Sequence, residues 1–405
     1  MITGIIAEYN PFHNGHLYQL RKIQEATGKE SAIIACISGG LTQRGELPIL
    51  NKWQRATLAV QHGVNLVLEL PTVFCCRSAQ HFAFGGVSLF HQLGIVEQLA
   101  FGTEYPDLDI LNALSDIDIS EYQPQLKSLL QQGFSYASAV CHVLSTITGI
   151  EEAILKEPNT ILGVEYLKAI SALNSSITPL PLMRVGAHHH DQSLQGTFAS
   201  GSGIRNMLRD NAHAAIKNTV PPKTMALLHD LNSTYNTPEK LYSALQLFIL
   251  NSTPEKLQEI CSVNEGLEHK IIEAATAQDM NGFINCLVGK RYQRSRINRM
   301  AACILLNLKK TTAENADKNG APYARVLAFD SKGKNLMKAI KENASIPLVT
   351  KVTKYINHRD YMNKKLLTPI QQLLYYDLAA NNLYELCQHT PVLHRDFITS
   401  PVNIQ

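Results

Sequence analysis

Two histidines, His13 and His16, lie in a Pro-Phe-His-Asn-Gly-His turn close to the start of the chain. An imidazole in such a turn can donate a hydrogen bond to a phosphate oxygen, most strongly when negative charge builds on that oxygen in a transition state. Attack on the α-phosphate of a nucleotide builds this charge and needs no nucleophilic side chain, because the second substrate attacks the phosphorus. The pair therefore indicates nucleotidyl transfer; the alternative is that both histidines only cap and pack a helix start.

The elements expected around this turn are a strand and a helix. Residues 2–7 form a short apolar run rich in β-branched side chains, which is typical of a buried parallel strand. Leu17, Leu20 and Ile23 recur at helical spacing among polar residues after the turn. The histidines therefore lie where a first strand leads into a first helix, and open α/β sheets bind ligands at this point. Gly15 allows the backbone to approach a phosphate closely.

Apolar runs alternate with helical periodicity through the first 210 residues. This order predicts an α/β fold, a Rossmann-like doubly wound parallel sheet. Strands are expected at residues 2–7, 33–37, 66–70, 98–101 and 180–185, with an insertion of helices at about 107–175. We predict three regions: a nucleotide-binding catalytic domain over 1–210, a mostly helical region over 211–320, and a small α+β region over 321–405 with strands at 325–329 and 348–352.

The charge is distributed unevenly along the chain. Residues 1–210 carry 13 Lys and Arg against 18 Asp and Glu, whereas residues 211–405 carry 24 against 16. A basic second half indicates that it binds a polyanion. The densest basic stretch contains no acidic residue, includes Tyr292 as a possible stacking ring, and predicts RNA contacts for Lys290, Arg291, Arg294, Arg296 and Arg299. The alternative is an ordinary solvated helix surface.

The run from Glu8 to Leu17 is similar to the His-x-Gly-His signature of the nucleotidyltransferase superfamily. In its wider form it resembles the bacterial tRNA(Met) cytidine acetate ligase family. The resemblance is dense over roughly residues 1–210 and thinner beyond. Further matching segments are Ser38-Gly39, Gln43 to Glu46, Lys52-Trp53, Glu69 to Pro71, Phe101 to Glu104, Pro158 to Gly163, Arg184 to Ala187 and Ser200 to Arg205.

The resemblance implies a reaction and its partners. ATP would activate acetate as acetyl-adenylate with release of pyrophosphate, and Mg²⁺ would arrive with the ATP. The acetyl group would pass to N4 of the wobble cytidine of elongator tRNA(Met), forming N4-acetylcytidine. His13 and His16 are the expected catalytic residues, and Gln43 and Arg44 are expected to face the acyl group or the RNA. The expected ATP-binding residues are Ile6, Ala7, Glu8, Tyr9, Asn10, Pro11, Phe12, His13, Asn14, Gly15, His16, Leu17, Tyr18, Gly102, Asn159, Arg184, Ser200, Ser202 and Arg205.

Some of these residues also have structural interpretations. Arg184 follows an expected strand, where it would form either a phosphate contact or a salt bridge. Asn159, in a Pro-Asn-Thr segment, would contact the nucleotide or serve only as a helix cap. Ser200, Ser202 and Arg205 open an expected helix, and their hydroxyls and guanidinium suit a clamp on the β- and γ-phosphates.

Several function classes are disfavoured. No run approaches the ~18 apolar residues of a membrane span, and no signal peptide precedes the first strand, so we expect a cytoplasmic protein with no membrane partner. The eight cysteines include no Cys-x-x-Cys pair and are expected to be reduced packing residues. No dedicated metal site is expected, because the adjacent side chains of His188, His189, His190 and Asp191 point in different directions.

Two other functions remain open at this stage. A small-molecule adenylyltransferase would share the histidine motif, although its chain would usually end near the first domain. A non-catalytic, nucleotide-dependent RNA-binding protein would share the basic second half. The sequence shows no obligate protein partner.

Overall fold

A computed structural model of the whole chain describes all residues except 185–196, 231–237, 265 and 291. Its described strands form one mixed, mostly parallel sheet in the order β5-β4-β1-β2-β3-β6-β7, and β8 pairs with β6. Strand β1 pairs in parallel with both β2 and β4, so the order reverses beside β1. The strands are β5 (Thr178–Met183), β4 (Gln98–Thr103), β1 (Ile2–Ala7), β2 (Ala32–Ser38), β3 (Leu66–Leu70), β6 (Ala324–Phe329), β7 (Leu348–Val349) and β8 (Val402–Asn403).

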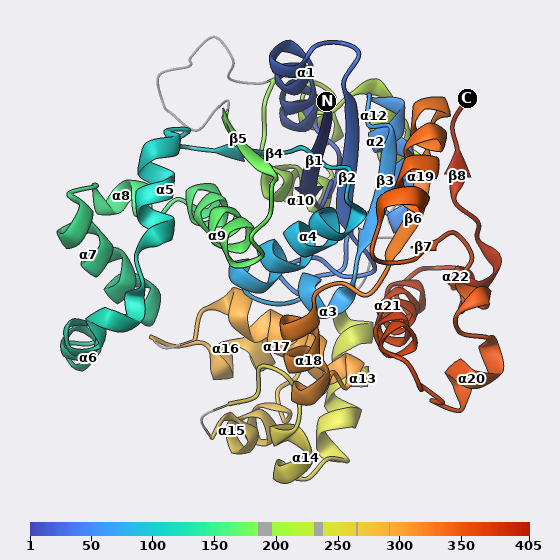
Figure 1. Cartoon of the computed structure of the whole chain (residues 1–405). Helices are drawn as coiled ribbons and strands as arrows, with labels where there is room; N and C mark the ends of the chain where they lie inside the picture. Colours follow the sequence, from blue (N-terminus) through green and yellow to red (C-terminus); the bar gives the residue numbers. More distant parts are fainter. Residues whose placement is uncertain (185–196, 231–237, 265, 291) are drawn as a thin grey trace.

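Helices cover both faces of this sheet, which confirms the doubly wound prediction (Figure 1). In β2, Ile33, Ala35 and Ile37 pack into one core and Ile34 and Cys36 into the other, because successive side chains of a strand point to opposite faces. The first core also contains apolar side chains of α1 (Asn14–Thr27) and α2 (Lys52–Gln61). The second contains those of α4 (Ala79–Leu93) and α9 (Pro158–Ala172). Burial on both faces explains why the strands are almost entirely apolar.

The expected helical insertion follows β4 and extends away from the sheet (Figure 1). It comprises α5 (Leu108–Asp116), η1 (Ile119–Tyr122), α6 (Gln123–Gln131), α7 (Tyr136–Thr148) and α8 (Glu152–Leu155). Small apolar clusters around Leu114 and Leu126 hold it together. Helix α9, which we had placed inside the insertion, instead packs on the sheet, since Tyr166 and Leu167 belong to the main core.

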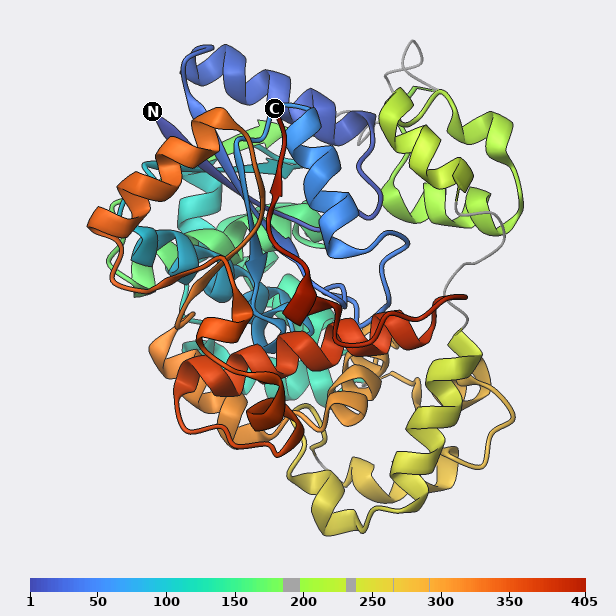
Figure 2. The ribbon, with the colours of Figure 1, turned by 90° about the vertical axis from the view of Figure 1, so that its right-hand side faces the viewer.

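Helices after β5 form two groups that lie apart in Figure 2. The first group is α10 (Gly201–Arg209), α11 (His213–Ile216) and α12 (Pro222–Asp230), whose Ile204, Ile216 and Leu228 pack into the same core as α1. It therefore spans the boundary predicted at residue 210. The second group is α13 (Pro238–Leu250), α14 (Pro254–Gln258), α15 (Leu267–Ala274), α16 (Met280–Leu287), α17 (Arg294–Leu306) and α18 (Lys310–Asn319).

The last part of the chain completes the main sheet. Strand β6 pairs antiparallel with β3, so the expected small α+β region shares the sheet of residues 1–210. Strand β7 ends at Val349, and the expected strand at 348–352 is shorter because a 3-10 turn begins at Val352. The remaining helices are α3 (Thr72–Cys75), which follows β3, and α19 (Ser331–Asn343), η3 (Val352–Lys354), α20 (His358–Met362), α21 (Pro369–Leu386) and α22 (Arg395–Ile398).

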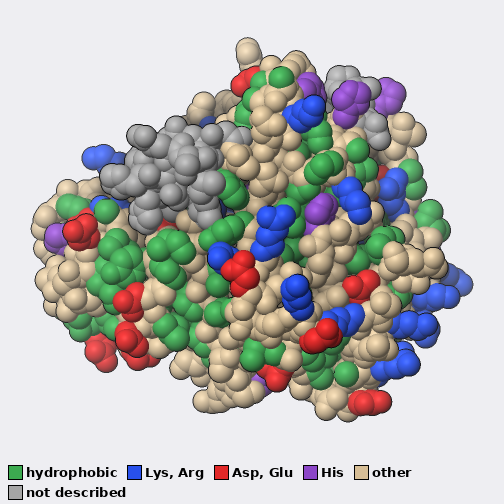
Figure 3. Space-filling view, turned by 90° about the horizontal axis from the view of Figure 1, so that it is seen from above, with side chains coloured by type: hydrophobic (Ala, Val, Ile, Leu, Met, Phe, Trp, Pro, Cys, Tyr) green, Lys and Arg blue, Asp and Glu red, His purple; other side chains and the backbone are tan. Residues whose placement is uncertain are grey.

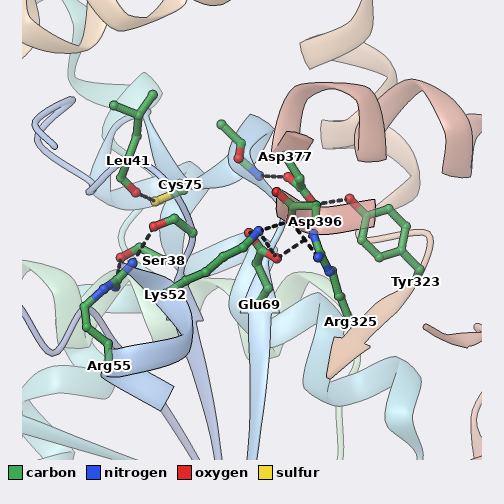
Figure 4. Close-up of polar contacts among 12 residues, drawn as sticks. Ser38, Leu41, Lys52, Arg55, Glu69, Cys75, Tyr323, Arg325, Asp377 and Asp396 are labelled. Atoms are coloured by element: carbon green, nitrogen blue, oxygen red, sulfur yellow. Dashed lines mark hydrogen bonds and ion pairs between the residues drawn. The ribbon is translucent and has the colours of Figure 1, made fainter. Parts of the chain in front are cut away.

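A buried ionic cluster joins the two ends of the chain (Figure 4). The Lys52 ammonium on α2 lies 2.8 Å from Glu69 of β3 and 2.6 Å from Asp396 of α22. The Arg325 guanidinium of β6 lies 3.1 Å from Glu69 and 2.6 Å from Asp396. Two cations and two carboxylates therefore lie together in a site almost closed to solvent, and loss of any one partner would leave a buried charge unpaired.

Other expectations concern cysteines and membranes. All eight cysteines are free and only Cys286 is exposed, as expected for packing residues. In the described part of the chain, no helix is both long and apolar enough to cross a bilayer. No group of three or more potential ligands among these residues could hold a metal ion.

Candidate active site

His13 and His16 form the start of α1, directly after β1. His13 is the N-cap residue, and its Nδ1 accepts a hydrogen bond from the amide of Gly15 at 3.1 Å. The amide of His13 in turn donates to Nδ1 of His16 at 3.2 Å. This reciprocal capping box satisfies two amides that the helix cannot pair itself. The capping role that we had kept as an alternative is therefore present.

Capping also determines which atoms remain for chemistry. An Nδ1 that accepts a hydrogen bond carries no proton, so the neutral ring of each histidine is protonated at Nε2. Burial, with a smaller contribution from nearby Arg184, lowers the pKa of His13 to about 3. Burial lowers the pKa of His16 well below its usual range, as do His13 and Arg184. Both rings are therefore neutral at pH 7 and retain an Nε2–H donor that no described residue accepts.

Arg184, at the end of β5, lies beside the two histidines and belongs to a polar network. Its Nη1 donates to Oδ1 of Asn159 at 3.3 Å, and its Nε lies 3.5 Å from Oε1 of Glu104. Glu104 also accepts a short hydrogen bond from Nδ2 of Asn159 and one at 3.0 Å from the amide of Thr160. Arg184 therefore forms a salt bridge with Glu104, which was one of the two roles expected for it. Its half-exposed side chain still borders the pocket.

Arg184 and Glu104 line a pocket of about 220 Å³ together with the two histidines, at the carboxyl ends of β1, β4 and β5, whereas the expected ATP-binding residue Asn159 is not among its lining residues. Its position is the crevice where the strand order reverses. Expected residues among its walls are His13, Gly15, His16, Tyr18, Gly102, Arg184 and Ser200. The predicted set omitted Gln19, Glu104, Glu157, Leu182, Met183, Phe198 and Ala199. Glu104 had a sequence signal, because it ends the Phe-Gly-Thr-Glu segment at a strand end; Phe198 had none.

The expected phosphate clamp on α10 is only partly directed at the pocket. Ser200 caps α10 through a hydrogen bond from the amide of Gly203 at 3.1 Å, and it borders the pocket. Ser202 lies 3.0 Å from Ser200, hydroxyl to hydroxyl. Arg205 instead donates to the carbonyl of Asn10 at 3.0 Å and does not line the pocket. In this structure its guanidinium therefore holds α10 against the first loop.

Much of the expected nucleotide-binding run supports the loop rather than lining the pocket. Tyr9 and Phe12 are buried, and their rings contact His16 at centroid distances of 4.9 and 5.5 Å. Asn14 Nδ2 donates to the carbonyls of Thr197 and Asn218, both at 2.9 Å. The remaining residues of this run also have structural contacts. The side chains of Ile6, Ala7 and Leu17 pack against the two apolar cores, and the side chain of Asn10 accepts a hydrogen bond from the Ile49 amide. The peptide bond between Asn10 and Pro11 is cis.

Gln43 and Arg44 lie in the loop after β2, next to the basic helix α17. The backbone amide of Gln43 donates a hydrogen bond to the carboxylate of Glu8 at 2.6 Å, and burial raises the pKa of this carboxyl. A side chain at Gly45, whose φ is +75°, would meet the backbone of Asn298 on α17 at 2.6 Å. The structure therefore brings the predicted acyl- or RNA-facing loop against the predicted RNA-binding stretch.

The basic stretch is less regular than a helix beginning at residue 290. Helix α17 begins at Arg294, and Lys290 precedes it as an exposed residue. Arg294 donates to Asn285 at 3.2 Å, and Arg296 lies over the Tyr292 ring at 4.6 Å. Arg291, His188, His189, His190 and Asp191 lie outside the described residues.

Charged side chains are unevenly distributed over the face of the molecule that Figure 3 shows. Figure 3 shows acidic and hydrophobic side chains over the left-hand part, where the insertion lies in Figure 1, and Lys and Arg side chains toward the right. The insertion is therefore a poor surface for a polyanion.

A Rossmann-like sheet with paired histidines at its first strand–helix turn defines a nucleotidyltransferase. A family model described as HIGH Nucleotidyl Transferase matches residues 1–396. A solved structure, Thermotoga maritima TmcAL bound with alpha-thio ATP, superposes with a TM-score of 0.88 at 29% identity, covering 100% of this chain and 99% of that one.

Curated relatives give the particular family. The tRNA(Met) cytidine acetate ligase of Clostridium kluyveri is 36% identical over 100% of this chain and 99% of its own length. The ligase of the same name from Caldanaerobacter subterraneus subsp. tengcongensis is 37% identical over 94% and 97%. The chain therefore belongs to the tRNA(Met) cytidine acetate ligase family of enzymes.

Proposed function

We propose that this enzyme joins acetate to the adenylyl group of ATP in the histidine pocket, with release of pyrophosphate, and then acetylates a cytidine of tRNA. The observation that carries the proposal is the convergence of two neutral Nε2–H donors and Arg184 on one pocket. The solved relative bound with alpha-thio ATP supports ATP as the nucleotide.

In the first step an acetate oxygen attacks the α-phosphorus of ATP, the bond to the β-phosphate oxygen breaks, and pyrophosphate leaves. Negative charge rises on the α-phosphate oxygens, where His13 and His16 would donate their Nε2 hydrogens. Arg184 would neutralise phosphate charge, and Glu104 and Asn159 hold its guanidinium in position. The neutral rings can fill this role because Nδ1 of each accepts a backbone hydrogen bond and the ring proton is therefore on Nε2.

In the second step the N4 amine of cytidine attacks the acetyl carbon of acetyl-adenylate, and AMP and a proton leave. The names of the relatives support tRNA(Met) as the RNA. We propose the wobble cytidine of elongator tRNA(Met) as the target, because an unpaired anticodon base can be turned into a cleft at modest cost. Lys290, Arg294, Arg296 and Arg299, together with Arg291, would contact the RNA, with Gln43 and Arg44 nearer the acyl group.

Mg²⁺ is proposed to enter with ATP. Glu104, an acidic side chain of the pocket, is already engaged by Arg184, Asn159 and Thr160. Phosphate oxygens and water would therefore supply most of the ligands of the ion.

Pyrophosphate–ATP exchange tests the first step. Labelled pyrophosphate should enter ATP only when acetate is present, first without RNA and then with added tRNA(Met). Exchange that requires acetate establishes carboxylate adenylation. Absence of exchange under both conditions would contradict the proposal, and exchange that ignores acetate would favour a different acyl or nucleotide substrate.

A further inference from the structure

A second hollow, of about 390 Å³, lies between the start of α4 and helices α17 and α18. None of its described lining residues also lines the histidine pocket. Its walls carry four cations, Arg77, Arg296, Arg299 and Lys310, against one carboxylate among the described lining residues, Glu314. The sequence analysis singled out two of these cations but placed no cavity beside them.

Three of the four cations form no ion pair with any carboxylate in the part of the chain that the structure describes. Among the described residues, no ion pair involves Arg296, Arg299 or Lys310, while Arg296 lies over an aromatic ring. Burial lowers the pKa of the half-buried Arg299, and repulsion from Arg296 and Arg44 lowers it further. A partly desolvated guanidinium among like charges is unfavourable unless an anion binds beside it.

The fourth cation, Arg77, is held in place by an ion pair with Asp317. Arg77 forms a two-pronged contact with Asp317, at 2.6 Å from Nη1 and 2.8 Å from Nη2. His81 lies 3.5 Å from the same carboxylate. Asp317 is therefore occupied by Arg77 and His81, and it offers little compensation to the three cations on the other walls.

A hydrogen-bonded chain connects this hollow to the first loop of the catalytic pocket. The side-chain amide of Gln43 donates to the carbonyl of Arg77 at 3.0 Å, and the backbone amide of Gln43 donates to Glu8 at 2.6 Å. Glu8 directly follows β1 and lies five residues before His13. An anion in the hollow would thus be held in a defined position relative to the catalytic histidines.

We propose that this hollow binds a backbone phosphate of the RNA substrate and so sets how the target nucleotide enters the catalytic pocket. The inference rests on the proposed function, since it requires an RNA substrate. Arg296 and Arg299 would supply planar guanidinium donors, and Lys310 would supply a point charge. The contact is sequence-independent and would position the RNA while recognition of the base occurs elsewhere.

The test compares Arg299→Gln and Lys310→Gln with a matched control, Lys334→Gln. Lys334 is exposed on α19, which follows β6 at the amino end of β3, where Phe329 pairs with Leu66. Arg77 of the hollow comes after the carboxyl end of β3. Binding of tRNA(Met) is measured by fluorescence anisotropy across a salt series. Each hollow variant should bind tRNA roughly 5- to 20-fold more weakly, and its slope of log K against log salt should fall by about 0.7–0.9. The control should match the unaltered protein.

Acetate-dependent pyrophosphate exchange without RNA is measured on the unaltered protein and on Lys334→Gln, and the two rates should agree. Absence of exchange in the unaltered protein both without and with tRNA(Met) would count against the proposed function, and unchanged tRNA affinity in Arg299→Gln would overturn this inference. If Arg299→Gln does not fold, Lys310→Gln decides by the same criterion. If ~10 mM inorganic phosphate raises the melting temperature of the unaltered protein but not of Arg299→Gln, while both bind tRNA equally, the hollow binds free anions and the inference is wrong.

Discussion

The imidazole rings of His13 and His16 stack with their centroids 3.7 Å apart and their planes 25° apart. This contact would be repulsive if both rings were protonated, and burial together with Arg184 keeps them neutral. Nδ1 of each ring accepts a hydrogen bond from the helix start, so only Nε2 remains as a donor. A local capping motif thereby leaves two Nε2–H donors on stacked rings, and in the proposed function these donors would bind phosphate.

Replacing His13 with Asn should separate the two roles of this histidine. Asn is a strong N-cap residue, so the variant should melt within about 2 °C of the unaltered protein, whereas His13→Ala should lose about 1 kcal/mol of stability. Both variants lack the Nε2–H donor and should slow acetate-dependent pyrophosphate exchange by ~10²-fold or more. Near-normal exchange in His13→Asn would remove the His13 ring from the mechanism.

The protonation state of the rings can be read directly. With ¹⁵N-histidine labelling, His13 and His16 should show the Nε2–H tautomer and no titration between pH 6 and 8, because their pKa values are depressed. A lowered pKa also means that folding excludes the proton, so the free energy of unfolding should fall as pH drops below about 6.5 toward 3. Assignment rests on loss of each signal in His13→Asn and His16→Gln. A midpoint near 6.5 for either ring would contradict the buried, neutral pair.

Substitutions of Arg184 and Glu104 should raise the KM for ATP to different extents. Arg184→Gln removes a charged donor to phosphate, so the KM for ATP should rise ~10-fold or more. Glu104→Gln keeps an acceptor for Asn159 and only loosens Arg184, so its effect should be smaller. Steady-state kinetics at varied ATP measure both. A larger defect in Glu104→Gln than in Arg184→Gln would show that the carboxylate itself contacts the substrate or its metal ion.

Asp377 predicts a pH-dependent stability. This buried carboxyl accepts from the Thr72 amide at 2.7 Å and from the Tyr323 hydroxyl, and burial, with repulsion from Glu69, raises its pKa to about 7. A folded-state pKa above the ordinary value of 3.8 means that stability declines as pH rises from about 4 to 7 and then levels off.

The side chain of Asp377→Asn does not ionise. The melting temperature of this variant minus that of the unaltered protein should therefore rise over the same pH range, by about 2 °C or more at pH 7.5. Differential scanning fluorimetry of both proteins in matched buffers measures the gain. Tyr323→Phe, which removes one hydrogen bond to the carboxyl, provides a comparison. A melting difference that does not change with pH would mean that Asp377 is ionised throughout.

Local patterns carried most of the correct sequence predictions. The strand at residues 2–7 and the turn at His13 were predictable because β-branched runs and N-cap positions depend on neighbours a few residues away. The parallel order around β1 followed from alternating strands and helices. The antiparallel pairing of β6 with β3 was not predictable, since residues about 260 positions apart in sequence meet through side-chain packing and the buried Lys52–Glu69–Arg325 cluster.

The candidate site residues also fall into those that local sequence predicts and those whose contacts depend on tertiary structure. Sequence alone determined that two histidines, a close-approach glycine and the first strand–helix turn form one site, because a few consecutive residues build it. Only the tertiary structure decided that Arg205 is held by the carbonyl of Asn10, that Glu104 orients Arg184, and that Arg299 borders a cationic hollow. Those outcomes depend on contacts between distant segments, where burial and charge are set by neighbours that no local pattern specifies.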